Sequence, residues 1–343
     1  MAEAVLPQVA VAAEAEVTAV KIFIPMKLPK ISRGAKLLRL SILGLAIQSL
    51  ALSQSLWAEG EQHFASPQDA ANALVTAARD NDTNAIHQIF GPEGRQLVSP
   101  DAVQAAESYN RFVKRLTEKT QIVTNSDSSI SLLIGSDAWP FPIPLVKDNS
   151  SGQWFFDTVA GRQEILNRRI GMNELGAIDV ARAYVQAQHE YASQDRMGDG
   201  VLAYAQFLRS TPGKQDGLFW PAEPGEPLSP LGPLVADARL EGYRHTATIL
   251  NEQLAPYHGY YFKILTRQGK HAAGGKFDYI INGRMIAGFA LVAWPAEWGN
   301  TGVMTFIVNQ QGTVYQRNLG PKTAKIASRM TVFDPDEKWI VVQ

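Results

Sequence analysis

A few carboxylates and tryptophans in the second half of the chain have the residue types that bind or cleave sugars. Asp216, Trp220 and Glu223 lie close together in one loop. Glycan cleavage or binding uses a pair of carboxylates beside an aromatic side chain. We favour the alternative in which Trp220 plugs the loop onto a sheet and the acids are solvated. Trp294 and Trp298 could form a second aromatic platform, although a turn packed by aromatic side chains is the simpler interpretation.

Other motifs in the chain do not support a catalytic or metal site. Gly269–Lys276 resembles a phosphate-binding loop, but it has one residue too many, and Phe277 stands where Ser or Thr would bind magnesium. We expect a hairpin loop there. Asp195–Gly200 half-matches a calcium loop, but Met197 and Gln206 occupy ligand positions, which favours a turn that caps a following helix. The six histidines show no metal-ligand spacing, so we expect no catalytic residue, metal or cofactor.

Length and composition set the class of protein. The chain has 343 residues, enough for about two domains. Hydrophobic residues make up 45% and charged residues 19%, as in a chain that buries a core. A net charge of −1 argues against a nucleic-acid surface. The chain contains no cysteine, which excludes disulfides, thiolate chemistry and a lipid anchor on cysteine.

Residues 1–58 have the pattern of a leader. No acidic residue occurs between Val17 and Ala58, and basic residues precede a short apolar run, Leu40–Leu52. A basic region, an apolar region and a small residue at Ala58 predict a secretory signal peptide. Leu56 is a poor residue for the cleavage site, so an uncleaved N-terminal anchor stays open. The normal-looking basic region that begins at Met26 suggests that translation starts there.

The leader predicts a periplasmic or secreted protein. Six of the 32 basic and three of the 33 acidic residues precede residue 59, so the mature chain carries a net charge of −4. We expect a soluble, mildly acidic protein whose partner is an envelope protein or a glycan. Contact with a membrane would come only through an uncleaved leader.

The first folded half, residues 59–165, predicts an α+β domain. Ser66 has the features of a helix N-cap, and the Ser99-Pro100-Asp101 triplet marks another helix start. Four strands follow the helices, at Gln121–Thr124, Ser129–Ile134, Phe141–Val146 and Gln153–Asp157. Helices followed by a curved antiparallel sheet are typical of NTF2-like cone folds, although fold analogy does not define function.

The second half, residues 166–343, predicts another α+β domain. It begins with a long helix from Ile165 to about Tyr191, continues through a short predicted helix, Gly200–Leu208, and enters a long loop, residues 210–233. Further helical turns are predicted at Leu234–Gly242.

An antiparallel sheet is predicted to close the chain. Its strands are expected at Tyr260–Thr266, Met285–Trp294, Val303–Asn309, Thr313–Gln316, Met330–Phe333 and Trp339–Val342. The run Met285–Trp294 is apolar at both odd and even positions, so we expect this strand to be covered on both faces. Gly312 predicts a tight turn after Asn309.

Three blocks of the second half resemble one family. They are Tyr204–Trp220, Ser229–Ala238 and the segment from Pro256 to the C-terminus. In block order and over residues 62–342, the chain is similar to a family of exported bacterial proteins known only as a domain of unknown function, DUF2950. The resemblance implies an envelope protein and no established activity. The C-terminal part also resembles the sheet of bacterial pilin-like proteins, but the leader lacks the prepilin pattern.

Three hypotheses about function follow. The first is a non-enzymatic envelope protein that binds a partner or supports assembly. The second is a glycan- or peptidoglycan-directed enzyme or binding protein that uses the 210–233 loop. The third is storage of a small ligand in the first domain, which requires an apolar cavity of several hundred Å³, the order of a typical pocket.

Overall fold

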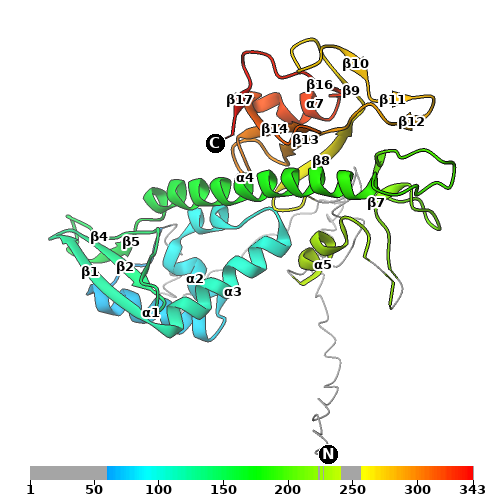
Figure 1. The fold of residues 1–343 in the computed structure, drawn as a ribbon. Coiled ribbons are helices and arrows are strands. Elements are labelled where there is room, and N and C mark those ends of the chain that lie inside the picture. The colour runs from blue at the N-terminus through cyan, green and yellow to red at the C-terminus, as the bar shows by residue number, and fades with distance from the viewer. Residues whose placement is uncertain (1–59, 223–224, 227, 241–255, 343) are drawn as a thin grey trace, which may run out of the picture. The chain divides into compact units, whose positions relative to one another are not determined.

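The computed structural model describes residues 60–222, 225–226, 228–240 and 256–342 (Figure 1). The leader, with the predicted signal peptide and Met26, lies outside the described residues. Helices and antiparallel sheets occur together in the compact unit Ser55–Gln343, which confirms the predicted α+β class.

The first part of the fold is a group of capped helices. They are α1 Pro67–Arg79, α2 Thr83–Phe90, the 3-10 helix η1 Pro92–Leu97 and α3 Ala102–Glu118. The Ser66 side chain accepts a hydrogen bond from the Asp69 N–H, and the Asp101 carboxylate accepts from Val103 and Gln104. These caps satisfy N–H groups that a helix start leaves unpaired, as predicted from the sequence.

The helices pack on an antiparallel sheet. Its strands are β1 Thr120–Ser126, β2 Ser129–Ile134, β3 Trp139–Pro140, β4 Leu145–Lys147 and β5 Trp154–Phe156, in the order β1-β2-β4-β5 with β3 also on β2. The predicted strand Phe141–Val146 is wrong over most of its length, because Pro142 and Pro144 cannot donate to a ladder. The finer NTF2-like assignment stays a prediction.

Aromatic rings pack between these helices and the sheet. Phe90 lies 5.5 Å from Phe156 and 6.1 Å from Phe141, measured between ring centroids, and Phe112 lies 5.6 Å from Phe141. Phe90, Phe141 and Phe156 are buried. They occupy the part of the interior in which the storage hypothesis would place its ligand, which argues against that hypothesis.

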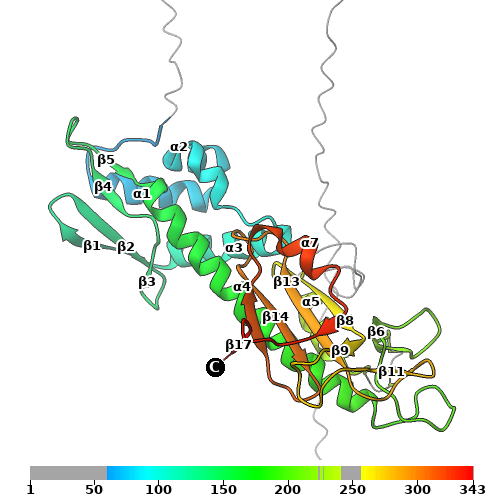
Figure 2. The same cartoon turned by 90° about the horizontal axis from the view of Figure 1, so that it is seen from above.

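One long helix, α4 Thr158–Tyr191, connects the first sheet to the second. The predicted boundary at residue 165 falls inside this helix. Near its start, Gly161 packs directly on Ile143 of the first part, where an added Cβ would lie 2.6 Å from an Ile143 side-chain atom. Its later turns pack on strands β13 and β14 (Figure 2).

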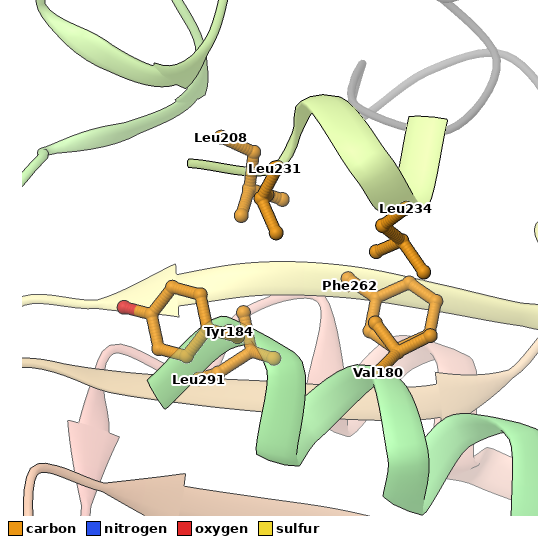
Figure 3. Close-up of a pocket in the computed structure, with 7 residues that line it drawn as sticks. All are labelled: Val180, Tyr184, Leu208, Leu231, Leu234, Phe262 and Leu291. Atoms are coloured by element: carbon orange, nitrogen blue, oxygen red, sulfur yellow. The ribbon is translucent and has the colours of Figure 1, made fainter. Parts of the chain in front are cut away.

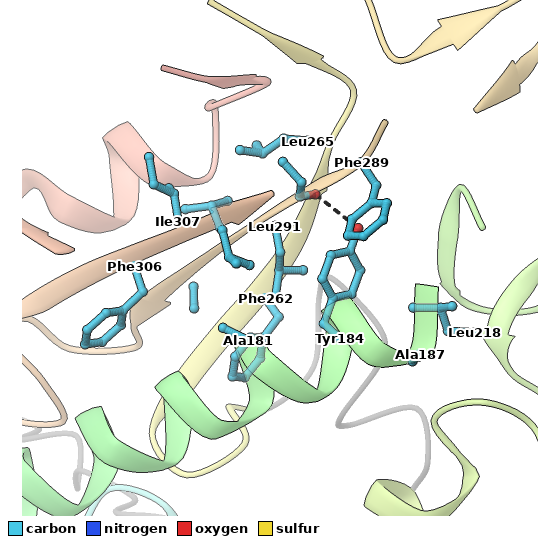
Figure 4. Packing of buried hydrophobic residues seen from close by; sticks show 14 of the residues in the cluster. Ala181, Tyr184, Ala187, Leu218, Phe262, Leu265, Phe289, Leu291, Phe306 and Ile307 are labelled. Atoms are coloured by element: carbon cyan, nitrogen blue, oxygen red, sulfur yellow. Dashed lines mark hydrogen bonds between the residues drawn. The ribbon is translucent and has the colours of Figure 1, made fainter. Parts of the chain in front are cut away.

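The second sheet has the order β17-β15-β14-β13-β8, antiparallel throughout. Its strands are β8 Tyr260–Leu265, β13 Ala290–Pro295, β14 Met304–Asn309, β15 Tyr315–Asn318 and β17 Ile340–Val341. Every residue of β13 is buried. Helix α4 covers one face of the sheet and α7 Thr323–Ala327 the other (Figure 1), which confirms the predicted two-sided coverage. Figure 4 shows Ala181 and Tyr184 of α4 packed on Phe262 and Leu291.

Smaller elements complete this half. They are β6 Phe207–Arg209, β7 Gly217–Phe219, α5 Gly232–Leu240, β9 Arg267–Gln268, β10 Phe277–Asp278, β11 Ile280–Ile281, β12 Arg284–Met285, η2 Gly320–Lys322 and β16 Val332–Phe333. Strands β9 and β10 pair in antiparallel fashion, so Gly269–Lys276 is the predicted hairpin loop.

Two further predicted elements are wrong. The segment Gly200–Leu208 is extended instead of helical, because the Gln188 side chain hydrogen-bonds both the N–H and the carbonyl of Ala205. Asp195 accordingly caps no helix. The predicted strand Met285–Trp294 is divided into β12 and β13, because the chain bends at Ala287, beside Gly288 with its positive φ of 152°.

Candidate binding surface

The loop that carries the predicted carboxylates is closed by one of them. The Asp216 carboxylate accepts hydrogen bonds from the Thr211 N–H at 2.7 Å and from the Thr211 hydroxyl at 2.8 Å. Glu223 lies outside the described residues. The described carboxylate therefore holds the turn together, and the predicted pairing of two carboxylates stays a prediction.

Trp220 belongs to the core. It is buried together with Phe219, and the Arg196 guanidinium lies 5.4 Å from the centroid of its ring. The Ser229 hydroxyl donates a hydrogen bond to the Trp220 carbonyl at 3.1 Å, which joins two positions of the loop that are nine residues apart. This geometry is that of the plug that we favoured over an exposed sugar platform.

A small apolar cavity lies beside this loop, between α4, α5 and the second sheet. It has a volume of about 10 Å³, about the space of a single water molecule. Figure 3 shows the side chains around it, which are Val180, Tyr184, Leu208, Leu231, Leu234, Phe262 and Leu291. It is a gap in the packing and is too small for an organic ligand.

The other two predicted tryptophans have different environments. Trp294 is buried and packs on Tyr261, with ring centroids 5.8 Å apart. Trp298 is 38% exposed, and its indole N–H donates a hydrogen bond to the Asn318 side-chain oxygen at 2.9 Å. Of these two tryptophans, Trp298 can therefore present its ring to a partner, and the bond to Asn318 fixes the orientation of that ring.

Strand register brings further side chains to the face of β15 that carries Asn318. Gln316 is two residues from Asn318, so both point to the same face, and Ile340 of β17 lies opposite Gln316. Ile340 is 66% exposed, and β17 ends the sheet. We call Trp298, Gln316, Asn318 and Ile340 the Trp298 surface. No local pattern links Gln316, Asn318 and Ile340 to a tryptophan that lies between 18 and 42 residues before them in the chain.

Polar side chains of α4 form hydrogen bonds with the turn that contains Trp298. Arg169 donates to the Asn300 side-chain oxygen at 2.6 Å, and Asn173 donates to the Thr301 carbonyl at 2.8 Å. One oxygen of Glu174 accepts from the N–H groups of residues 303 and 304, both at 2.9 Å. Arg169 and Asn173 are buried, so these bonds are shielded from water.

Within the turn, Glu297 supports the same geometry. Its N–H donates to the Thr301 hydroxyl at 3.0 Å, and its carboxylate accepts from the Asn300 amide at 2.7 Å. The helix and the turn together define a rigid position for Trp298. None of these polar residues is predicted from the sequence.

Two described carboxylates have shifted pKa values, and both shifts are downward. Hydrogen bonds from Ser151 and Ser150 lower the pKa of Asp148 to about 2. The N–H groups of Gly200, Met197 and Gly198 lower the pKa of Asp195. A general acid at neutral pH needs a raised pKa, so neither carboxylate suits that role. Among the described residues, no group of histidine and acidic side chains could hold a metal ion.

The fold and this surface define an α+β protein in which one long helix supports both the second sheet and an exposed, hydrogen-bonded tryptophan. The chain belongs to the family described as proteins of unknown function (DUF2950), whose model matches residues 61–342. The predicted resemblance to this family is confirmed, and the pilin-like resemblance is not. No curated protein and no solved structure matches the chain. In the part of the chain that the structure describes, no helix has both the length and the apolar character to span a bilayer.

Proposed function

We propose that the protein is a non-enzymatic binding protein of the bacterial cell envelope that holds a protein partner at the Trp298 surface. The observation that carries the proposal is Trp298 itself. Its ring is exposed, whereas its turn is fastened by Arg169, Asn173 and Glu174. Tryptophan is enriched among the residues that dominate protein interfaces, and a rigid side chain loses little entropy on binding.

The edge of the second sheet supports the same role. Strand β17 exposes Ile340 and Val341, and residues at the end of a sheet can accept another strand or pack against a partner. An exposed aromatic side chain, two amide side chains and an apolar strand end match the composition of an interface core with a polar rim.

A role in binding accounts better for the described polar groups than catalysis does. Asp216 is used to close its loop, and the pKa values of Asp148 and Asp195 are lowered by local hydrogen bonds. Export is part of the proposal because the leader has the pattern of a secretory signal peptide. Membership of the family assigns no activity to this chain, because the family is described as proteins of unknown function.

Crosslinking in intact cells, followed by recovery of the protein from the envelope fraction, tests the proposal. The test compares the natural chain with a Trp298→Ala/Ile340→Ser variant and with Val123→Ser, which removes an apolar residue of β1 that is about as exposed as Trp298. We expect one reproducible protein partner that the double variant loses and the control keeps.

Two results would contradict the proposal. Recovery of glycan fragments in place of a protein would support the glycan hypothesis and direct attention to Asp216 and Glu223. Recovery of the protein from the cytoplasm with its leader intact would contradict a role in the envelope.

A further inference from the structure

The two ends of the first sheet differ in how they are covered. At one end, β5 is paired with Phe64, whose N–H donates to the Trp154 carbonyl at 2.7 Å and whose carbonyl accepts from the Trp154 N–H at 2.8 Å. At the other end, β1 pairs with β2 and with no other described strand. Figure 2 shows β1 on the outer side of the β1–β2 hairpin. The sheet is therefore open to another strand along β1.

The bonds of β2 show which backbone groups of β1 point outward. The Leu132 carbonyl accepts from the Phe141 N–H at 2.8 Å, on the side of β2 away from β1. Leu132 lies opposite Ile122, so these two residues form an antiparallel pair that shares no hydrogen bonds. Ile122 therefore directs its N–H and carbonyl away from β2. Because the bonding direction alternates along a strand, Thr120 and Thr124 direct theirs to the same side.

Strand β1 lacks charges and prolines, the residues that commonly keep an exposed edge from pairing. Its seven residues read TQIVTNS, a sequence rich in β-branched side chains that favour strands. An irregularity in its register with β2 lies between Thr124 and Ser126, near the end of the strand. The Asn125 side chain still donates to the Ser131 hydroxyl at 2.8 Å, so Asn125 stays on the same face as Val123, which lies opposite Ser131. The composition of this edge therefore favours the addition of a strand.

The segment 119–127, KTQIVTNSD, is complementary to its own reverse. When two copies run antiparallel about Val123, residues of matching kind lie opposite each other. The pairs are Ile122 with Thr124, both β-branched, Gln121 with Asn125, both amides, Thr120 with Ser126, both hydroxyls, and Lys119 with Asp127, of opposite charge. Matched side chains opposite each other stabilise an antiparallel pair, whereas like charges destabilise it. The chemistry of this edge therefore fits a second copy of the same edge.

Lys119 and Asp127 provide the charges at the two ends of this segment. Both side chains are exposed, and neither forms an ion pair with a described residue. Lys119 has an extended backbone, with φ −161° and ψ 135°, so it continues the line of β1, whereas Glu118 before it belongs to α3. Opposite charges at the ends favour the register centred on Val123 over shifted registers.

We propose that β1 is a contact between two copies of this chain, which pair antiparallel about Val123 and join their first sheets into one. Ile122 of each copy would exchange backbone hydrogen bonds with Thr124 of the other. A two-fold contact uses the same residues on both copies, so it closes as a dimer and leaves no free β1 edge. The dimer contact uses no residue of the Trp298 surface, and it does not rest on the proposed function.

The chain contains no cysteine, so a single introduced cysteine reports the register of the contact. The two copies of residue 123 would face each other with Cα atoms about 4.5 Å apart, within the range of a disulfide. Val123→Cys should therefore give a disulfide-linked dimer when the purified protein is oxidised with copper phenanthroline. Gln121→Cys is the matched control on the same face. Its two cysteines would lie roughly 13 Å apart along the strands, too far for a disulfide, so it should give none.

Charge reversal tests the same register without a crosslink. Analytical ultracentrifugation of the natural chain should show a monomer–dimer equilibrium. Lys119→Asp and Asp127→Lys should each weaken dimerisation at least about tenfold, because like charges then lie opposite each other. A mixture of these two variants should recover dimers, since each then meets the opposite charge on the other. The control Lys325→Asp makes the same change at an exposed position of α7 and should dimerise as the natural chain does. Circular dichroism of each variant establishes that it is folded.

The proposal would be overturned if the natural chain stayed monomeric at every concentration tested, or if the folded charge-reversal variants dimerised as well as the natural chain. Equal disulfide formation at positions 121 and 123 would contradict the register. A dimer that Trp298→Ala/Ile340→Ser abolishes would contradict the proposal as well, because the contact would then lie at the Trp298 surface.

Discussion

The Gln104 side-chain N–H donates a hydrogen bond to the Asn173 side-chain oxygen at 2.5 Å, and both residues are buried. The Asn173 amide then donates to the Thr301 carbonyl. A single asparagine of α4 thus connects helix α3 with the turn that carries Trp298. Each of its two bonds joins segments that are far apart in the sequence.

Asn173→Ala should destabilise the protein by about 1–3 kcal/mol, because it leaves the Gln104 amide and the Thr301 carbonyl buried without their partner. Urea unfolding measures this loss. Asn167→Ala on the same helix is the matched control, since the Asn167 side chain is exposed and accepts a hydrogen bond from the neighbouring Gln163 side chain, and its effect should stay within about 0.5 kcal/mol. Equal effects of the two changes would contradict the connecting role of Asn173.

Gly259 should tolerate no side chain. Its φ is 72°, and an added Cβ would lie 2.6 Å from the Asn173 side-chain nitrogen and 2.9 Å from Thr301. Gly299 has a similar φ of 80° but open space around it. Gly299→Ala should cost about 1–2 kcal/mol for the left-handed backbone alone. Gly259→Ala should cost about 1–3 kcal/mol more because it also overpacks the site. If Gly259→Ala and Gly299→Ala had the same unfolding midpoint, the prediction would be contradicted. That result would show that the atoms beside Gly259 move to make room for the added Cβ at little cost in free energy.

Substitutions of Trp220 and Trp298 should differ in their cost in stability, because we assign Trp220 to the core and Trp298 to the binding surface. Trp220→Ala should cost about 3–5 kcal/mol, because it removes a large buried side chain. Trp298→Ala should cost about 1 kcal/mol, chiefly the bond to Asn318. Denaturant unfolding measures both values. A loss at Trp298 as large as that at Trp220 would mean that Trp298 is a structural residue.

Asp148 should contribute stability that depends on pH. Its pKa is lowered from 3.8 to about 2 in the folded protein by Ser151 and Ser150. A lowered carboxyl pKa gives stability that is present above pH 4 and is lost as the pH falls through about 2. Asp148→Asn should therefore have a lower urea midpoint than the natural chain at pH 7. The difference between the two midpoints should shrink as the pH falls toward 2.

Ser151→Ala tests the cause of this shift. It removes the hydroxyl that donates to Asp148 at 2.6 Å, so the pKa of Asp148 should rise toward its ordinary value. Titration of the Asp148 carboxyl carbon by NMR in the folded protein measures the change. An unchanged pKa would assign the shift to another group.

Local signals predicted much of the fold. Ser66 and Asp101 were recognised as helix starts because a cap acts within three residues of its own position. The two-sided burial of β13 followed from its unbroken apolar run. The helix predicted at Gly200–Leu208 is wrong for a non-local reason, because Gln188 lies outside this segment and its side chain takes the backbone groups of Ala205.

The candidate surface was only partly predictable. Residue type marks Trp298 only as half of a possible platform with Trp294, for which a packed turn is the simpler interpretation from sequence, and its exposure depends on strand register and on α4. Arg169 and Asn173 meet residues 300 and 301, more than a hundred positions along the chain. No periodicity within a single element carries that information. The buried positions of Trp220 and Trp294 likewise follow from tertiary packing.

A photo-crosslinking residue placed at Ile340 and activated in living cells tests the central claim most directly. The same residue at Val123 serves as the control, since it is exposed on a different sheet. The account predicts one discrete protein adduct from position 340 that Trp298→Ala removes, and that position 123 does not form. No adduct from position 340, or the same adducts from both positions, would contradict a binding role for the Trp298 surface.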